Sequence, residues 1–528
     1  MFSVAIYIGF YAYLVLCLGL AGLLYKQTIL ITALVYLIVI LLLNKNNITK
    51  IRFLRLKINK ISIIFLSLIF LQVLINLLGA LGPELSYDAL WYHLTIPKIF
   101  LENHSIFHIP GGLFYYSDMP KLTEMLYIPA LAINNEILAK LIHFSFGILA
   151  LFALYKVSQS FLSKSYSILT CLIFYSNLVV GWESISAYID LSRTFYEIMT
   201  VWGFINYLES NKKRWLVITG LMLGFAISTK LLALGSLLII VLLLILKYFK
   251  KRKNSLSDIF YIITPAFFVP LPWFILSYIN TRNPIFPFFS SFYDFGINIH
   301  LLNPFNFVKD LWNLFMYSAD PISPVYILFL PLIVIFYKKL NQNAKIIAVY
   351  SLISLLIWYI TPRTGGGRFI LPYLPAYSIL AAASIGIMPI KRLSKFLVSF
   401  IVIVSVISIV YRGFANIKYL PVVFLKQSKN EFLNKNLNFS YGDFYDIDSY
   451  FKNKIKKADK VLIFGGHNLY YVYFPFVHES YIKKGDKFNY VLLIKHDLPK
   501  RFRHWNLVYK NDITNVMLYT LDNQKWTY

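Results

Sequence analysis

The chain has 528 residues, of which 58% are hydrophobic and only 14% are charged. A soluble domain usually carries about 25% charged residues, so this composition excludes an ordinary soluble protein. The formal net charge is +27. The basic residues lie between hydrophobic blocks, and no basic face alternates with base-stacking aromatics, which argues against nucleic-acid binding. Cys17 and Cys171 lie inside apolar blocks and offer neither a disulfide framework nor a CxxC metal site.

The hydrophobic blocks are long enough to cross a bilayer, which takes about 20 residues. The blocks 61–81 and 231–246 contain no charged residue at all. The first block resembles a signal peptide, but it lacks a basic start and a small-residue cleavage site, so we interpret it as a retained helix. We predict about thirteen membrane-spanning helices, at residues 2–25, 27–43, 61–81, 137–156, 165–182, 188–208, 215–229, 231–248, 258–280, 323–338, 344–361, 369–388 and 395–411.

The distribution of Lys and Arg predicts the orientation of these helices. The gaps on one side hold 22 Lys and Arg residues and those on the other side hold 10, counting short hairpins and helix ends. Because the basic side of a membrane protein faces the cytoplasm, we expect a multi-pass protein of the cell membrane. Three features then face outwards: the loop 82–136 with two short interfacial helices (87–101 and 120–133), the loop 281–322, and the C-terminal tail.

The tail from Arg412 to Tyr528 differs from the rest in being polar. It contains short β-rich runs at 461–464 and 490–494, which predict a small soluble α/β domain of about 110 residues, an ordinary domain size. Gly465-Gly466 follows the first run. A glycine pair after a strand can bind phosphate, but a tight turn is the better interpretation.

The loop 82–136 contains the first candidate for chemistry. Ser86 is suited to cap a helix, which would bring Asp88 into the first turn, where the helix dipole favours the ionised carboxylate. An ionised carboxylate is what a general base needs. Trp91 and Tyr92 lie three and four positions further on, on the same face, and aromatics beside a carboxylate commonly line sugar sites. The alternative is an interfacial aromatic belt in which Asp88 only caps the helix.

Further ionisable residues fall on the predicted outer side, where charged groups near a membrane are costly and often functional. They are Asp118, Lys121, Glu124, Asp190, Lys230 and Arg368. Lys121 and Glu124 are spaced to share a helix face, so a simple ion pair is an alternative for them. Arg368 follows three glycines and precedes an apolar block. Independent loops that converge on one side of a membrane favour a common site.

The order of these motifs resembles the GT-C superfamily of membrane glycosyltransferases. The similarity is strongest to the bacterial branch related to protein O-mannosyltransferases and lipid A aminoarabinose transferases. It extends over about residues 60–390, and the motifs are Tyr87–His93 with Pro97-Lys98, Ala187–Tyr196, Gly220–Lys230, Asn283–Pro287 and Gly367–Pro372. The resemblance implies an all-α polytopic transmembrane bundle. Residues 1–60 would form two additional helices and a basic cytoplasmic loop, 61–411 the catalytic domain, and 412–528 the soluble domain.

The resemblance also implies a reaction. A sugar on a polyprenyl phosphate would be the donor, and an extracytoplasmic glycan, lipid or protein would be the acceptor. Asp88 would act as general base, with Asp190 and Glu124 orienting donor or acceptor groups. Arg368 would bind the donor phosphate, because guanidinium recognises phosphate in bidentate geometry. The other substrate-binding candidates are Lys230, Lys121, His93, Trp91, Tyr92 and Asp118.

Three departures from the family pattern bear on these expectations. Two extra helices come first, the tail does not resemble the carbohydrate-binding repeats of some relatives, and Asp88 stands alone where protein mannosyltransferases have an Asp-Glu pair. Some members bind a divalent cation through acidic motifs with His. Glu84, Asp88 and His93 are the candidates for such a site, which would suit Mg or Mn, although we assign no metal ligand.

Two other function classes stay open. A transporter or flippase of a lipid-linked or small solute would also carry polar residues within the membrane, but such proteins more often show repeated halves and polar groups at mid-membrane. Neither feature is evident in this sequence. The third class is an inactive scaffold whose tail binds a partner.

Overall fold

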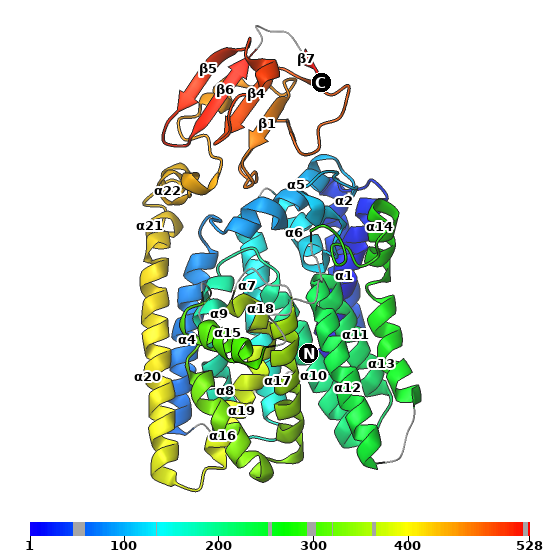
Figure 1. Ribbon diagram of the computed structural model, residues 1–528, viewed down its shortest axis with the longest axis vertical. Helices are drawn as coiled ribbons and strands as arrows, with labels where there is room; N and C mark the ends of the chain where they lie inside the picture. The colour runs from blue at the N-terminus through cyan, green and yellow to red at the C-terminus, as the bar shows by residue number, and fades with distance from the viewer. Residues whose placement is uncertain are drawn as a thin grey trace.

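In the computed structural model, a tall helical bundle carries a small sheet domain on one end (Figure 1). The structure describes residues 1–45, 59–133, 135–251, 256–292, 303–318, 320, 322–361, 366–520 and 526–528. Part of the predicted basic loop 44–60 and residues Thr364 and Gly365 of the glycine run before Arg368 lie outside these ranges.

Seven helices of the described residues are long and apolar enough to cross a membrane. They are α1 (Phe2–Leu20), α2 (Lys26–Leu43), α4 (Lys60–Ala80), α7 (Glu136–Ser158), α17 (Gln342–Ile360), the unit of α18 (Gly367–Ile370), η6 (Leu371–Tyr373) and α19 (Leu374–Gly386), and α20 (Lys391–Asn416), which continues through η7 (Ile417–Tyr419) and α21 (Leu420–Val423). The pair α13 (Leu256–Phe268) and α14 (Leu271–Thr281), bent by 55°, is an eighth candidate.

Each of the thirteen predicted ranges falls on helical structure, but several are shorter or broken. The remaining helices of the bundle are α5 (Thr95–Glu102), α6 (Leu122–Ala132), α8 (Lys164–Tyr175), α9 (Leu178–Glu183), α10 (Asp190–Ser210), α11 (Arg214–Thr229), η3 (Leu231–Ala233), α12 (Leu234–Lys251), α15 (Pro304–Met316), α16 (Val325–Phe336) and η5 (Tyr337–Lys339). The predicted helix 2–25 ends at Leu20, and α15 was not predicted.

The breaks have local causes. The predicted helix 165–182 divides at Asn177, whose side-chain amide donates to the carbonyls of Ile173 and Phe174 and accepts from the amide of Ser323. A side chain that bonds the backbone in this way competes with helical hydrogen bonds. The predicted helix 258–280 bends at Pro270, which has no N–H to continue the ladder.

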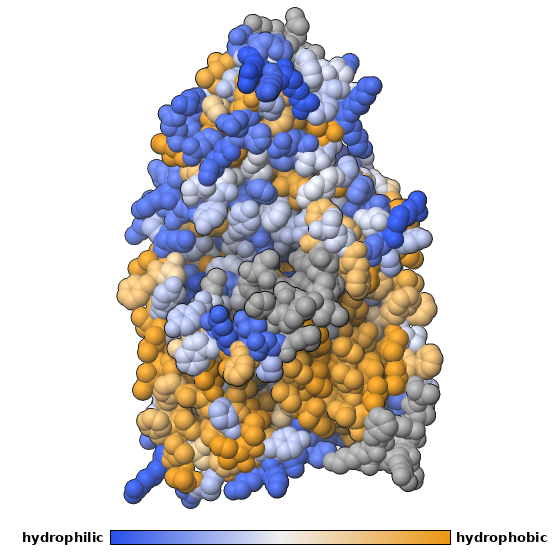
Figure 2. Space-filling view, viewed as in Figure 1, coloured by the Kyte–Doolittle hydropathy of each residue, from blue (hydrophilic) through white to orange (hydrophobic). Residues whose placement is uncertain are grey.

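Asparagines begin several of the long helices. Asn59, Asn135 and Asn341 each accept a hydrogen bond at the start of a helix, from the amides of Ser62, Leu138 and Ala344 respectively. Such caps satisfy backbone donors that the first helical turn leaves unpaired. Between its polar ends the bundle presents a broad hydrophobic band to its surroundings (Figure 2). This band agrees with the membrane assignment made from composition, because a monomeric soluble protein rarely exposes so large an apolar surface.

The C-terminal domain contains a five-stranded sheet in the order β2-β1-β4-β6-β5. The strands are β1 (Val461–Gly465), β2 (Phe476–His478), β4 (Tyr490–Ile494), β5 (Asn506–Asn511) and β6 (Val516–Thr520), with β3 (Lys487–Phe488) and β7 (Trp526–Thr527) as a separate pair. Short helical segments precede the sheet: α22 (Lys429–Asn436), η8 (Phe439–Tyr441) and α23 (Tyr450–Lys454). Both predicted β-rich runs form central strands. Gly465 and Gly466 form the predicted turn, with φ of +69° and +66°.

Candidate functional site

A cavity of about 750 Å³ lies among four segments that are far apart in the sequence. They are the loop between α4 and α7, the junction of α11 and η3, the segment around Pro287, and the start of α18, and Ile189 directly before α10 adds a fifth. Eight of the ten residues singled out from the sequence line this cavity: Asp88, Trp91, Tyr92, His93, Lys121, Glu124, Lys230 and Arg368. The expected convergence of these separate loops is therefore present in the fold.

Asp88 begins a short π-helical turn, η1 (Ala89–His93), which precedes α5. Its carboxylate Oδ2 accepts hydrogen bonds from the Tyr92 hydroxyl at 2.8 Å and from Arg368 Nη1 at 2.6 Å. Its backbone amide donates to the hydroxyl of Tyr188 at 3.1 Å. The predicted sharing of a face by Asp88 and Tyr92 is thus present. In the helix expected over 87–101, a π-helical turn replaces the first part, and α5 (Thr95–Glu102) forms the second part.

Arg368 joins the cavity to the interior of the bundle. Besides contacting Asp88, its Nε donates to Asp190 Oδ2 at 2.9 Å and lies 3.4 Å from Glu183 Oε1. The guanidinium also lies over the ring of Tyr188, 4.3 Å from the centroid. Only 12% of the Arg368 side chain is exposed, against 20% for Asp88. The arginine therefore presents one edge to the cavity and is held by carboxylates on its other side.

Asp190 lies behind the cavity wall and connects its two cations. It is the first residue of α10, and its Oδ1 accepts from Lys230 Nζ at 2.6 Å while Oδ2 accepts from Arg368. Lys230 is held in extended conformation between α11 and η3, and its ammonium lies over the ring of Phe369. Since Asp190 is 1% exposed, it can orient the two cations but has little access to a ligand.

A buried histidine fixes the start of α10. His143 Nε2 accepts from the amide of Leu191 at 3.0 Å, so its Nδ1 carries the proton and donates to the carbonyl of Ser186 at 2.8 Å. Glu84 lies in the loop that carries Asp88. Its carboxylate accepts hydrogen bonds from the amides of Leu85 and Ser86 and, at 2.6 Å, from the amide of Ala187. These contacts join the loop that carries Asp88 to the segment that carries Asp190.

Of the other predicted residues, His93, Lys121 and Glu124 line the cavity, and Asp118 does not. Glu124 pairs with His93, whose Nδ1 lies 2.9 Å from Glu124 Oε1, and both side chains are almost fully buried. Lys121 does not pair with Glu124; its ammonium donates to the carbonyl of Tyr116. Asp118 is not among the cavity-lining residues, because its carboxylate faces His108 at 2.9 Å and Asn280 at 2.7 Å.

The residues proposed for a cation do not gather into one site. Glu84 is used by three backbone amides, His93 faces Glu124, and Asp88 faces Arg368. Among the described residues, no group of three or more His, Cys, Asp and Glu side chains is arranged to hold a metal ion. The described side chains therefore do not fit the Mg or Mn that some relatives' motifs made possible, and no step below depends on one.

Sequence reasoning missed Glu183, Tyr188 and much of the aromatic wall. Glu183 is fully buried beside Arg368, and a lone carboxylate at the edge of an apolar block was a usable signal. The wall includes Tyr115, Tyr116, Phe288 and Phe292 in addition to Trp91 and Tyr92. The ring of Tyr116 stacks on Tyr92 at 3.7 Å between centroids. Aromatic rings around a carboxylate and two cations can hold a polar ring such as a sugar beside a charged group.

Opposing influences act on the Asp88 carboxyl. Burial raises its pKa, whereas the charge of Arg368, with smaller contributions from His93 and Tyr92, lowers it, and the net pKa lies below the ordinary value. Burial lowers the pKa of His93, which favours the neutral imidazole despite its contact with Glu124. Asp88 is thus ionised at neutral pH and paired with a cation that an anionic ligand could take over.

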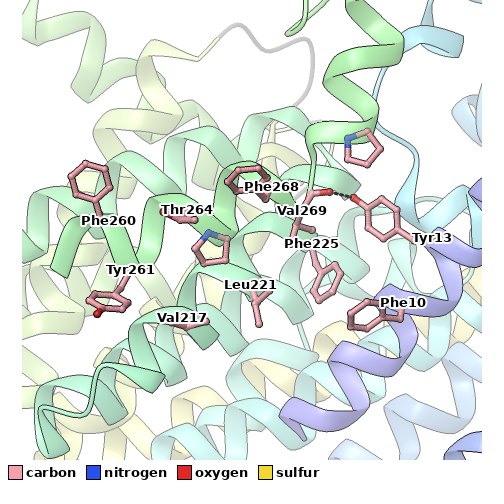
Figure 3. Close-up of a pocket in the computed structure, with 12 residues that line it drawn as sticks. Phe10, Tyr13, Val217, Leu221, Phe225, Phe260, Tyr261, Thr264, Phe268 and Val269 are labelled. Atoms are coloured by element: carbon pink, nitrogen blue, oxygen red, sulfur yellow. Dashed lines mark hydrogen bonds between the residues drawn. The ribbon is translucent and has the colours of Figure 1, made fainter. Parts of the chain in front are cut away.

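A second, apolar groove of about 660 Å³ lies between α1, α11 and α13 (Figure 3). Val217, Leu221 and Phe225 of α11 line it at a spacing of four residues, which puts them on one helix face. The same face leads on to Thr229 and then Lys230, which line the polar cavity. Tyr13 of α1 also lines the groove, and its hydroxyl donates a hydrogen bond to the carbonyl of Val269.

Comparison with known proteins supports the resemblance. The family described as dolichyl-phosphate-mannose-protein mannosyltransferase matches residues 127–275, a segment that includes Asp190 and Lys230 but neither Asp88 nor Arg368. No curated protein sequence matches the chain significantly.

Solved structures extend the similarity to nearly the whole fold. ArnT from Cupriavidus metallidurans in the apo state is 12% identical, with a TM-score of 0.56, over 86% of this chain and 97% of that protein. The same protein bound to undecaprenyl phosphate gives 12% identity and a TM-score of 0.54 over 87% and 97%. The Archaeoglobus fulgidus oligosaccharyltransferase in complex with Zn and sulfate gives 11% and 0.49 over 87% and 73%. The predicted GT-C-like bundle with a small C-terminal domain is therefore confirmed as a fold.

Proposed function

We propose that this protein is a membrane glycosyltransferase that transfers a sugar from a polyprenyl-phosphate donor to a hydroxyl group outside the cell membrane. The observation that carries this proposal is the meeting of Asp88 and Arg368, 280 positions apart in the sequence, on the wall of one cavity. Lys230 adds a second cation to that wall. A base next to a phosphate-binding pair is what direct displacement of a lipid phosphate by a hydroxyl requires.

The donor phosphate would bind Arg368 and Lys230. The carboxylates of Asp88 and Asp190 now hold these cations, and a phosphate that binds them would take the contact that Arg368 makes with Asp88. Asp190 would keep both cations oriented from behind. The prenyl chain would follow the apolar face of α11 through the groove in Figure 3, because that face leads directly to Lys230. The undecaprenyl phosphate bound to ArnT from Cupriavidus metallidurans is a ligand of this class.

Asp88 would accept the proton of the acceptor hydroxyl while that oxygen attacks the anomeric carbon. The bond from that carbon to the phosphate oxygen then breaks, and the lipid phosphate leaves with the electron pair, held by Arg368. Attack opposite to the leaving group inverts the anomeric carbon. As Arg368 turns to the phosphate, Asp88 loses the cation that lowers its pKa, so donor binding would strengthen the base. Trp91, Tyr92 and Tyr116 would pack against the sugar.

His93 and Glu124 would bind polar groups of the sugar or acceptor, with Lys121 as a further donor. His93 Nε2 and Glu124 Oε2 are buried and have no hydrogen-bond partner among the described residues. Unpaired buried polar atoms are costly, and hydroxyl groups of a bound sugar would satisfy them. This feature favours a carbohydrate over an apolar solute in the cavity.

The decisive experiment uses the purified protein in lipid nanodiscs with a panel of undecaprenyl-phosphate sugars labelled in the sugar, including hexoses and a pentose. A delipidated cell-envelope fraction serves as acceptor source. Release of undecaprenyl phosphate together with label in the acceptor fraction is the expected result. Label that crosses the bilayer of proteoliposomes without cleavage of the donor would instead identify a transporter or flippase.

The proposed orientation has its own test. In a variant with Cys17 and Cys171 changed to Ser, single cysteines at Ser105 and Ser440 should both react with a membrane-impermeant maleimide in intact cells. Ser105 lies in the loop that follows α5, and Ser440 is exposed in the C-terminal domain. Protection of both positions until the cells are lysed would reverse the orientation and exclude an external acceptor.

A further inference from the structure

The C-terminal domain contacts the turn that carries Asp88 through a short segment, residues 467–472, here called the docking segment. The amide of Tyr470 donates to the carbonyl of Leu90 at 3.2 Å. The hydroxyl of Tyr471 donates to the carbonyl of Glu84 at 2.9 Å, and this bond is buried. The docking segment therefore holds the chain on both sides of Asp88, two positions after it and four positions before it.

Lys98 provides the third contact. It lies in α5, directly after the turn, and its ammonium donates to the carbonyl of Tyr470 at 2.9 Å and to that of Val472. It also lies over the ring of Tyr470. An ammonium that donates to two carbonyls of another domain is a strong cross-link, since hydrogen bonds from charged groups are worth more than neutral ones. Lys98 was part of the family-like motif, but it does not line the polar cavity.

The geometry of the docking segment depends on the glycine pair before it. Gly465 and Gly466 both have positive φ, and a Cβ on Gly465 would lie 2.3 Å from the carbonyl oxygen of Ile494. Only glycine allows β1 to end in this turn so close to β4. The turn brings His467 against Trp91, with ring centroids 5.4 Å apart at 81°. The C-terminal domain thus reaches the rim of the cavity that Trp91 lines.

The phosphate-binding candidates have different supports. Arg368 comes from α18, and Lys230 from the junction of α11 and η3. Both are held by Asp190 at the start of α10. The docking segment therefore contacts the part of the cavity wall that carries Asp88, while the helical bundle positions Arg368 and Lys230.

We propose that the docking segment is a positioning element of the active site, through which the C-terminal domain holds Asp88 in register with the cations of the bundle. This inference rests on the proposed function. The proposal predicts a lower kcat and a changed pH dependence of Asp88, with the donor KM unchanged. A domain that merely stabilised the protein would reduce the active fraction without either selective effect.

The first experiment measures hydrogen exchange of the full-length protein in nanodiscs without any substrate. Lys98→Met keeps the aliphatic stem and removes the ammonium, and Tyr471→Phe removes one hydroxyl. Both should increase the exchange of amides 86–94, leaving α10 as in wild type. The matched controls are Lys495→Met and Tyr445→Phe. These remove a lysine–carbonyl contact to Ser440 and a hydroxyl contact to Asn430 elsewhere in the C-terminal region. Unchanged exchange of 86–94 in Lys98→Met would overturn the proposal.

The second experiment is kinetic and uses whichever labelled donor the wild type turns over. Misplacement of a catalytic group by about 1 Å can cost about 100-fold in rate, so Lys98→Met should lower kcat by about 10- to 100-fold with donor KM within about twofold. In the enzyme without donor, loosening Asp88 from Arg368 should raise the pKa of Asp88 and move the acid limb of the kcat/KM profile upward. A lower kcat with an unmoved acid limb would contradict the positioning role. If the wild type turns over no donor, the proposed function fails. Hydrogen exchange still tests whether the docking segment holds residues 86–94 in place.

Discussion

Helix α10 contributes to two clusters of charged residues, which contain similar ion pairs but lie in different surroundings. At its first residue, Asp190 joins Lys230 and Arg368 and thereby reaches Asp88. One turn further, Arg193 and Glu197 form a pair four positions apart at 3.2 Å. Here the cavity cluster means Asp88, Asp190, Lys230 and Arg368, and the core cluster means Arg193 and Glu197 with Ser236 and Tyr373.

The two clusters differ in what they face. In the core cluster, the Arg193 and Glu197 side chains are 2% and 1% exposed, and they are bonded to Tyr373 at 3.2 Å and Ser236 at 2.6 Å, respectively. In the cavity cluster, Arg368 and Asp88 turn toward a space large enough for a ligand. A charged pair inside a membrane is therefore insufficient evidence for a functional site. The informative feature is an ion pair with one partner open to a cavity.

The largest expected effect comes from the base. Asp88→Asn preserves the shape of the side chain and removes its charge and basicity. Loss of a general base typically costs about 10²–10⁴ in rate, so kcat should fall by that factor while the thermal unfolding temperature in detergent stays close to wild type. Turnover measured with the active donor checks this. Near-normal turnover of well-folded Asp88→Asn protein would remove Asp88 from the mechanism.

The core cluster should respond in the opposite way. Arg193→Met leaves Glu197 buried without its cation, and breaking a buried pair in this way costs about 3–5 kcal/mol. The unfolding temperature should fall markedly, while kcat per folded molecule, measured well below that temperature, stays within about threefold of wild type. The double variant Arg193→Met with Glu197→Met should recover much of the stability. A selective loss of donor binding in Arg193→Met would show that the two clusters are not separate.

Arg368→Lys sharpens the comparison on the cavity side. Lysine keeps the charge but cannot bind a phosphate in bidentate geometry. Losing one charged hydrogen bond, worth about 1.5–3 kcal/mol, should raise the donor KM about tenfold or more. Arg412→Lys is the control, because Arg412 lies in α20, donates to Asn416 and is not among the residues that line the cavity. Equal donor KM in wild type and Arg368→Lys would return Arg368 to an interfacial role and shift phosphate binding to Lys230 or Lys121.

The smallest expected effect concerns pH. Because the pKa of Asp88 lies below its ordinary value of 3.8, wild-type kcat/KM should show no acid limb from Asp88 between about pH 5 and 8. The Tyr92 hydroxyl favours the ionised carboxylate. Tyr92→Phe should therefore raise the pKa of Asp88 and move the acid limb of the kcat/KM profile upward. Tyr11→Phe in α1 is a control remote from the cavity. A downward shift in Tyr92→Phe would contradict the geometry.

The sequence predicted much of the site but not its pairings. Asp88 and Tyr92 could be assigned to one face because they are four positions apart. The sequence did not show which way the side chains of Asp118 and Glu124 turn, because both lie in the predicted loop 82–136. The fold turns Glu124 toward His93 in the cavity wall and Asp118 toward His108 and Asn280. Glu183 was missed because a single carboxylate beside an apolar run gives no sign of its partner.

The sequence by itself determined the class of the molecule, the positions of its helices and the polar nature of its tail. These properties depend on composition and on runs of neighbouring residues. Long apolar stretches are excluded from water, and within a membrane their backbone N–H and C=O groups must form hydrogen bonds inside the segment, as a helix allows. Only the tertiary structure decided that Arg368 meets Asp88 and Asp190 and that Lys98 contacts the C-terminal domain. The contacts of Arg368 and Lys98 join residues hundreds of positions apart, and local patterns carry no information about which distant charges the packing of helices will bring together.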